Sequence, residues 1–371
     1  MRSLKKNLPR MEKQSGLAII TVMLIIALLV TLLGFLVEQQ HLLIRRITNQ
    51  NVAEQSLQYA AGVDAWAARV LHDDVDRAID YWEEDWARFG EDPEENATDR
   101  EEFSLTLSSQ QEEEALPVID FGNDVELEYR IDDLNGKFNL NNLANREPAY
   151  QRGQRSVFLN LLGILEIGEF GEREQLYGAL VDWMDENDVE TANGFESGNY
   201  RIKNTPYYAA DQKLSSLGEL RFVEGFNEDI INGLAPYVTV LPVENARVNI
   251  NTTSAEVLAS LSAVPVADLS SVQTFLAQRL EEGFLGFQPA QIELAKTAII
   301  GLVPANGRAV PNMMQTTSQF FQVNTRVVLG DFLYCTKTTL LREGGSPDAE
   351  SAPKVTILNR EHSSLCDEII R

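Results

Sequence analysis

The chain has 371 residues, with 31 lysines and arginines against 56 aspartates and glutamates, so its formal net charge is −25 at pH 7. A surface this acidic repels nucleic acid and anionic lipid, which argues against proteins that bind those polyanions. The length accommodates a membrane anchor and about two globular domains.

The apolar segment Leu17–Val37 is the clearest signal in the N-terminal region, because none of its residues is charged. As a helix with a rise of about 1.5 Å per residue it is roughly 31 Å long, enough to cross the core of a bilayer. The residues before it carry one acid, Glu12, and five basic side chains, at Arg2, Lys5, Lys6, Arg10 and Lys13. Positive charge before a first apolar helix predicts a cytoplasmic N-terminus, with the rest of the chain across the membrane.

The only plausible cleavage site lies before this helix. A secretory signal peptide has an apolar core of about 7–15 residues followed by a site of A-x-A type, and neither feature is present here. A cut between Gly16 and Leu17 would remove the basic residues 1–16 and leave the apolar helix as the new N-terminus. This arrangement resembles the type III leader of type IV pilins and pseudopilins. The resemblance implies cleavage after Gly16 and methylation of the new amine of Leu17.

The fifth residue after that cut is Thr21, where most members of the pilin family have glutamate. A carboxylate inside a membrane needs a partner, and in the family this glutamate pairs with the N-terminal amine of a neighbouring subunit. A subunit without it needs no neighbour above. The K-type minor pseudopilins of the type II secretion system share this departure and are assigned to the tip of the pseudopilus.

An apolar stripe continues beyond the membrane segment, which spans residues 17–37. Its residues recur at spacings of three and four, as on one helix face, at Leu57, Ala61, Ala65, Ala68, Leu71, Val75, Ile79, Trp82 and Trp86. We predict one helix from about Leu17 to Arg88, whose part within residues 38–90 packs against a globular head. A coiled-coil receptor stalk is the alternative, but the stripe holds alanines where a coiled coil carries larger residues.

The head is predicted to contain a β-sheet. Within residues 91–136, an acidic loop precedes Val125–Ile131, which alternates apolar and polar residues as a strand with one buried face does. Residues 237–371 add further strand patterns, at Tyr237–Leu241, Phe320–Leu329, Phe332–Leu341 and Lys354–Leu358. We expect Gly330-Asp331 to form a tight turn between two of these strands.

Residues 137–236 show helical patterns instead. Val157–Ile167 is dense in leucine and isoleucine, Glu172–Glu186 is amphipathic, and Asn227–Leu234 predicts a short helix. Ser216 with Glu219 predicts a capping box. Because this block lies between strands, we interpret it as an all-helical insertion in the sheet domain, and the predicted fold class is α+β.

An asparagine-rich pattern occurs twice, as Phe138-Asn139-Leu140-Asn141 and as Val248-Asn249-Ile250-Asn251, which suggests a weak internal repeat. Thr253 with Glu256 predicts a capping box after the second copy. Such turns before short helices resemble helix-hairpin-helix modules, and an inserted domain of that type or of the SAM type is expected. DNA binding is not, because the second copy lacks the glycine amides and basic side chains that phosphates require.

An irregular calcium loop is predicted in the helical block. Ca²⁺ takes six to eight oxygen ligands, and carboxylates and amides are concentrated at Asp182, Asp185, Asn187, Asp188 and Glu196. Asp185, Asn187 and Glu196 occupy the first, third and twelfth positions of an EF-hand loop. Glu190 is at the sixth position, where that loop requires glycine. The alternative is that these acids cap helices or are solvated.

The chain has two cysteines, Cys335 and Cys366. Outside the cytoplasm they are expected to form a disulfide, because that environment is oxidising. Two buried free thiols are the alternative.

Four further blocks extend the resemblance over nearly the whole chain. They occur in the same order in K-type minor pseudopilins, at Asp133–Asn141, Asp182–Asp185 with Gly194–Glu196, Ser216–Leu220 and Val248–Thr252. The resemblance implies a pilin-like head with an inserted helical domain and bound Ca²⁺. Two departures reduce the negative charge of the loop: Asn187 stands where the family usually has a third aspartate, and Ser197 ends a motif that usually reads Gly-Ala-Glu-Asp.

The resemblance further implies a single-pass inner-membrane protein with its N-terminus in the cytoplasm and its head in the periplasm. It implies a minor pseudopilin that caps the tip of the type II secretion pseudopilus, helps to initiate its assembly and supports export of folded proteins across the outer membrane. The expected partners are the I- and J-type minor pseudopilins, other pseudopilins, prepilin peptidase and secreted substrate proteins. A minor pilin of a type IV pilus and a membrane-anchored periplasmic receptor or adhesin are the alternatives.

An enzyme is not expected. His41, His72 and His362 are far apart along the chain, and no nucleophile elbow, phosphate loop, zinc motif or dinucleotide fingerprint occurs. A hydrolase using Asp182 and Asp185 as an acid–base pair is the remaining enzymatic alternative.

Overall fold

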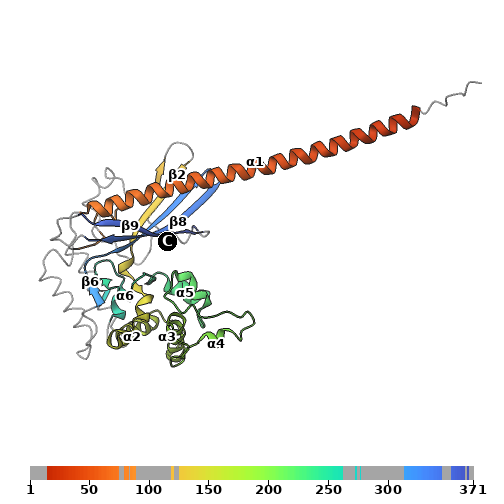
Figure 1. The fold of residues 1–371 in the computed structure, drawn as a ribbon. Coiled ribbons are helices and arrows are strands. Elements are labelled where there is room, and N and C mark those ends of the chain that lie inside the picture. Colours follow the sequence, from red (N-terminus) through yellow and green to blue (C-terminus); the bar gives the residue numbers. More distant parts are fainter. Residues whose placement is uncertain are drawn as a thin grey trace, which may run out of the picture. The chain divides into compact units, whose positions relative to one another are not determined.

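The computed structural model describes residues 15–74, 79–82, 84–88, 118–120, 125–261, 272–273, 276, 313–344, 352–363 and 366. The predicted leader up to residue 14 and most of the acidic stretch, residues 89–117, lie outside them. The chain forms two compact units, Met1–Gln58 and Tyr59–Arg371 (Figure 1).

In its described part the first unit consists of residues 15–58 of one helix, whose last residues, 59–73, belong to the second unit. Helix α1, Ser15–Asp73, contains the predicted membrane segment, and its large apolar side chains from Ile19 to Val37 are exposed. Among the described residues, α1 is the one helix that is long and apolar enough to cross a membrane. Its composition is that of a single-pass membrane anchor.

The second unit is built on a five-stranded antiparallel sheet with the strand order β1-β2-β7-β8-β9. The strands are β1 Val118–Asp120, β2 Val125–Asp133, β7 Phe320–Leu329, β8 Phe332–Glu343 and β9 Lys354–Ser363. The predictions for β2, β7, β8 and β9 are confirmed, although β9 is longer than predicted. Gly330 has φ +58°, which suits glycine, and it turns the chain between the paired residues Leu329 and Phe332.

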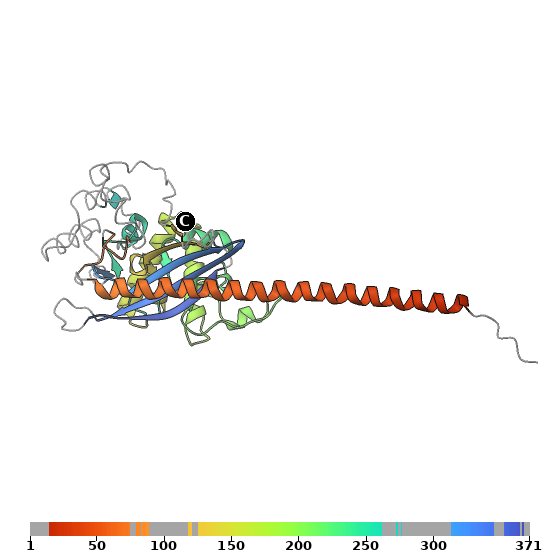
Figure 2. The same ribbon diagram turned by 90° about the horizontal axis from the view of Figure 1, so that it is seen from above.

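The last four turns of α1 pack on one face of this sheet, and the long strands run obliquely to the helix (Figure 2). The buried helix positions are Ala60, Val63, Asp64, Ala67 and Leu71. The predicted stripe is confirmed only in part: Leu71 is fully buried and Ala68 packs against the core, but Leu57 is 40% exposed and Ala65 is exposed. A hydropathy pattern assigns Asp64 to solvent, whereas in the structure it accepts hydrogen bonds from Arg360 of β9 and Thr338 of β8.

Helix α1 ends at Asp73, so the predicted continuation to Arg88 was also wrong. The physical reason is charge pairing after the helix end, because Asp74 and Asp80 both form ion pairs with Arg342 of β8. The backbone N–H of Asp80 donates to the carbonyl of Thr316 at 2.8 Å, which is incompatible with a continued helix. Beyond this point Trp86 is buried, with its ring 5.2 Å from that of Phe321.

Between β2 and β7 the chain forms a helical region with its own core. Its helices include α2 Pro148–Ile164, α3 Phe170–Met184, α4 Ser197–Tyr200, α5 Glu228–Leu234 and α6 Ala255–Ser260, with short 3-10 turns η1 Leu134–Gly136, η2 Leu140–Ala144 and η3 Leu217–Phe222. In Figure 1 the sheet lies between α1 and the group α2, α3, α4 and α5. The α+β class with a helical insertion is therefore confirmed.

The helical region extends further along the chain than the predicted boundary at residue 236. Its core includes Val248, Ile250, Val257 and Met314 together with residues of α2 and α3. The chain returns to the five-stranded sheet only at Phe320. The predicted strand around Val238 is present as the short β4, Val238–Thr239. It pairs with the short β3, Phe138–Asn139, rather than with the large sheet.

The two asparagine-rich segments have matching local structures. Each begins with a two-residue strand in a parallel pair: β3 pairs with β4, and β5 Val248–Asn249 pairs with β6 Met314–Gln315. Asn139 Oδ1 accepts the N–H of Asn141 at 3.3 Å, and Asn249 Oδ1 accepts that of Asn251 at 3.0 Å. The repeat is thus a turn in which asparagine satisfies its own backbone.

Two predicted capping boxes differ in detail. Ser216 makes no side-chain cap at η3, and Glu219 instead accepts the backbone N–H of Ser215 at 2.8 Å. At α6 the cap is Ser254, whose hydroxyl accepts the N–H of Val257 at 3.3 Å, rather than Thr253. At α6 the cap is displaced by one residue, which is within the usual accuracy of helix ends, whereas Ser216 is still the N-cap residue of η3 and lacks only the side-chain hydrogen bond.

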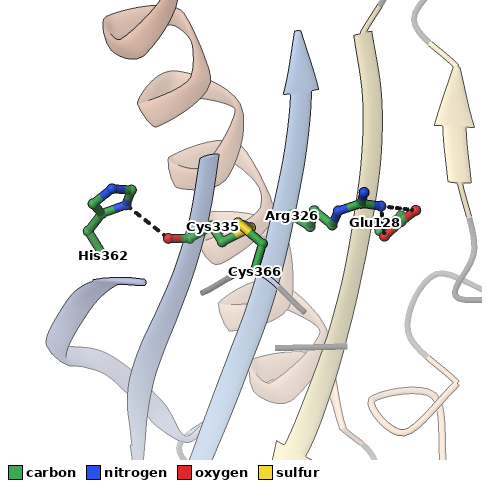
Figure 3. The surroundings of a disulfide bond; sticks show 5 residues. All are labelled: Glu128, Arg326, Cys335, His362 and Cys366. Atoms are coloured by element: carbon green, nitrogen blue, oxygen red, sulfur yellow. Dashed lines mark hydrogen bonds and ion pairs between the residues drawn. A yellow bond between two sulfur atoms is a disulfide. The ribbon is translucent and has the colours of Figure 1, made fainter. Parts of the chain in front are cut away.

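The predicted disulfide is present: Cys335 of β8 is bonded to Cys366 near the chain end. Figure 3 shows it in front of the sheet with α1 behind, beside the ion pair of Arg326 and Glu128 (2.7 Å). His362 contacts the carbonyl of Cys335 at 3.1 Å. The bridge ties the end of the chain to a central strand.

Replacing Arg342 with Met should destabilise the protein strongly. Arg342 is 6% exposed and pairs with Asp74 and with the fully buried Asp80. Removing one partner of such a group leaves uncompensated buried charge, which costs about 3–5 kcal/mol. Denaturant unfolding of the full chain in detergent micelles measures the loss.

The control is Arg326→Met, which removes a more exposed pair with Glu128. It should cost about 1 kcal/mol or less. Equal losses for the two variants would contradict a special role for the buried pair.

Candidate metal centre

The end of α3 and the start of α4 bring three predicted ligands together. Asp182 lies in the last turn of α3 and is fully buried, Asp185 is the C-cap residue of that helix, and Glu196 is the N-cap residue of α4. One carboxylate oxygen from each lies within 4.8 Å of the others. A hard cation is the ligand that such a group of oxygens suits.

The loop that joins the two helices is shaped around Asp182. The backbone N–H of Thr191 donates to Asp182 Oδ1 at 3.1 Å, and the hydroxyl of Thr191 donates to the same oxygen. A Cβ atom built on Gly194 would overlap Asp182 Oδ2, so any larger residue there requires the carboxylate of Asp182 to move. On the other side of the loop, a Cβ on Gly178 would lie 2.9 Å from the backbone of Asn193.

The three carboxylates repel one another. Burial, assisted by the charges of Asp182, Asp185 and Asp188, raises the pKa of Glu196 to about 7. Burial, with a contribution from Asp182 and Asp211, also raises the pKa of Asp185. A bound cation would compensate this repulsion directly.

Glu196 also has spare hydrogen-bonding capacity. It is 3% exposed, and its Oε2 atom accepts the N–H of Ser197 at 3.3 Å. Its other oxygen, Oε1, is buried and has no hydrogen-bond partner among the described residues. A buried carboxylate oxygen without a partner costs free energy, and a metal ion fits this position.

Asn187 and Asp188, the other two predicted ligands, are exposed. The side chain of Asn187 accepts the N–H of Val189 at 2.9 Å, and it lines a cavity of about 770 Å³ beside Asp185. Asp188 lines a second cavity, of about 740 Å³, beside Glu196. The structure thus joins three of the five candidates and leaves two at the rims of adjoining cavities.

Asp211 was missed at the sequence level. It lines both cavities, has φ +50°, and its N–H donates to the carbonyl of Trp183 at 3.1 Å. It stands 15 residues beyond Glu196, so no spacing within the loop indicates it. Thr191 was missed too, because threonine has no special frequency at metal loops.

A second group of three acids lies at the exit of α1 and consists of Asp74, Asp80 and Glu84. Burial, with smaller contributions from the two aspartates, raises the pKa of Glu84 to about 9. Arg342 supplies the positive charge for the aspartates. The ion pairs with Arg342 therefore account for the two aspartates of this group without a metal ion.

Comparison with known proteins places the helical region in a family. Two family models described as "Type II secretion system (T2SS), protein K" match residues 136–243 and 248–296. Type II secretion system protein K of Pectobacterium carotovorum is 26% identical, covering 86% of this chain and 90% of the relative. That of Pseudomonas aeruginosa is 27% identical, covering 89% of each.

The helical region belongs to the protein K family of type II secretion systems, and relatives of that name align with most of the chain. The role of the chain is therefore that of a minor pseudopilin in type II secretion, as the resemblance implied. The fold agrees with this assignment: a chain in the crystal structure of the GspK-GspI-GspJ complex from enterotoxigenic Escherichia coli matches with a TM-score of 0.60 at 19% identity. The match covers 86% of this chain and 99% of that one.

The five candidate ligands all lie in the first matched region, residues 136–243. So do the glycines that shape the loop, Gly178 and Gly194. Residues 244–247, between β4 and β5, separate the two matched regions, and both regions contribute residues to the core of the helical region.

Gly194→Ala should destabilise the helical region by about 1–3 kcal/mol, the usual cost of overpacking, because the new methyl group would overlap Asp182. Gly198→Ala is the matched control, since a Cβ there meets nothing within 4 Å. Denaturant unfolding of both variants measures the difference. Equal free energies of unfolding for Gly194→Ala and Gly198→Ala would contradict a close approach of the loop to Asp182.

Proposed function

We propose that this protein caps the tip of the type II secretion pseudopilus in a complex with the I- and J-type minor pseudopilins, and there helps to initiate assembly and export folded proteins across the outer membrane. The observation that carries the proposal is the match to a chain from the GspK-GspI-GspJ complex, 99% of which this protein covers. Thr21 supports it, because the residue cannot supply the carboxylate that binds a neighbouring subunit. The large helical region supports it too, since such bulk is hard to stack repeatedly along a thin filament.

The proposal includes a single pass through the inner membrane, with the N-terminus in the cytoplasm and the head in the periplasm. The apolar part of α1 and the basic residues before it support this orientation. The Cys335–Cys366 disulfide supports an oxidising compartment for the head. Prepilin peptidase would cleave after Gly16, and the new amine of Leu17 would be methylated.

The role is structural rather than enzymatic, with other pseudopilins and secreted proteins as further contacts. Calcium would stabilise the head by binding Asp182, Asp185 and Glu196, with Asn187 and Asp188 nearby. Support comes from the clustered carboxylates and from the unpartnered Oε1 atom of Glu196. The ion would offset the mutual repulsion that raises the pKa of Glu196.

Isolation of the tagged full-length protein from membranes of its own host should recover the I- and J-type minor pseudopilins. Mass spectrometry of the same sample should find a mature N-terminus at Leu17 bearing an additional methyl group. The Gly16→Val variant should remain 16 residues longer and recover neither partner. A wild-type protein that still begins at Met1, or that recovers no other pseudopilin, would refute the proposal.

Calcium should raise the melting temperature of the full-length protein in detergent micelles, and a chelator should lower it. At a free concentration of about 100 times the dissociation constant, a ligand of the native state adds about 2.7 kcal/mol. Asp185→Ala should abolish the difference, whereas Asp229→Ala, at an exposed acid of α5, should keep it.

The calcium effect should also depend on pH. Because burial raises the pKa of Glu196 to about 7, the ion-free protein gains stability from protonation of this group as the pH falls through 7. Protons then compete with the ion, so the calcium-induced rise should be larger at pH 8 than at pH 6. If calcium leaves the melting temperature unchanged at both pH 8 and pH 6, these acids are helix caps and solvated charges rather than metal ligands.

A further inference from the structure

Helix α4 presents Glu196 to the metal centre, yet it cannot hold that residue by itself. It consists of the four residues Ser197–Tyr200. A single helical turn has almost no stability of its own, so tertiary contacts must fix its position. The question is which side chains supply those contacts.

A cluster of aromatic rings includes sequence neighbours of two of the candidate ligands. Trp183 follows Asp182, and its ring lies 5.4 Å from that of the fully buried Tyr200. Phe195 precedes Glu196, and its ring lies 4.7 Å from that of Tyr200. Tyr200 thus connects α4 to both sequence segments that carry ligands.

Lys203 closes this cluster from the solvent side. Its ammonium nitrogen lies over three rings, 5.0 Å from the centroid of Phe195, 4.8 Å from Tyr200 and 5.4 Å from Tyr207. It also donates to the hydroxyl of Tyr207 at 3.2 Å and pairs with Glu224 at 2.5 Å. Three rings and one carboxylate leave the ammonium few other positions.

The same contacts join α4 to the chain beyond η3. The N–H of Glu224 donates to the hydroxyl of Tyr200 at 3.1 Å, and the hydroxyl of Tyr207 donates to the carbonyl of Phe222 at 2.9 Å. Lys203 therefore holds together three pieces of chain: the ligand loop, α4 and the segment 222–224. If the ammonium is lost, the rings lose the charge that draws them together.

We propose that Lys203 is a positioning residue of the metal centre: held by Phe195, Tyr200, Tyr207 and Glu224, it fixes α4 so that Glu196 faces the ion. The inference rests on the calcium function proposed above. Residues that orient metal ligands without touching the metal typically account for about 10–100-fold in affinity. Lys203 should belong to this class although it carries the same sign of charge as the ion.

The test is a calorimetric titration of the full-length protein in detergent micelles with Ca²⁺. Lys203→Met keeps the length of the side chain but removes the ammonium, and it should weaken Ca²⁺ binding by about 10-fold or more. Lys203→Arg keeps a cation over the rings and should stay within about 3-fold of the wild type. The matched control is Lys213→Met, because Lys213 lines the adjoining cavity but pairs with Glu244 instead.

A merely structural contribution of Lys203 would lower the melting temperature equally with calcium and with chelator, and would leave the affinity unchanged. Wild-type binding together with unchanged affinity in Lys203→Met would overturn the inference alone. A wild-type protein that binds no Ca²⁺ would overturn the calcium proposal itself, and the positioning role with it. The two failures are therefore distinguishable in one set of titrations.

Discussion

The head depends on one buried polar network in which the parts of the second unit meet. Asn249 donates to the carbonyl of Asp80 at 3.1 Å, to Asp133 at 3.1 Å and to the hydroxyl of Ser318 at 2.8 Å. Arg342 completes the network by pairing with Asp80. Buried charges are tolerated only when they are paired and hydrogen-bonded, so each member fixes its neighbours. The exit of α1, the end of β2, the repeat at β5, the start of β7 and the end of β8 are thereby set in one arrangement.

The candidate metal centre follows a different principle, because the described hydrogen bonds to the carboxylates of Asp182 and Glu196 come from Thr191 and from the backbone of Ser197, and none comes from an arginine. The helical region that contains it is anchored to the network through the second asparagine turn, where Asn249 is a member of both, and its own core holds α2 and α3 in place. Rigid elements thus carry Asp182, whereas a single turn carries Glu196. This asymmetry makes the position of Glu196 depend more on tertiary contacts than that of Asp182 does.

Much of the sheet was predictable from the sequence, since alternation at Val125–Ile131 and Phe320–Leu329 reflects one face packed on α1. The buried face of α1 was not, because Ala60 and Ala67 are small and Asp64 is charged. The burial of Asp64 depends on Arg360, which lies almost 300 residues away in the chain. The helix end at Asp73 depends in the same manner on Arg342.

The sequence by itself determined the membrane segment, the acidic character, the cysteine pair and the presence of an oxygen-rich loop, because each depends on composition or on spacing within one segment. Only the tertiary structure decided which carboxylates meet. It selected Asp182, Asp185 and Glu196, left Asn187 and Asp188 at the cavity rims, and added Asp211 beside them. The physical reason is that ligand geometry is set by where two helix ends lie, and that is decided by long-range packing around Trp183 and Tyr200, which local patterns do not contain.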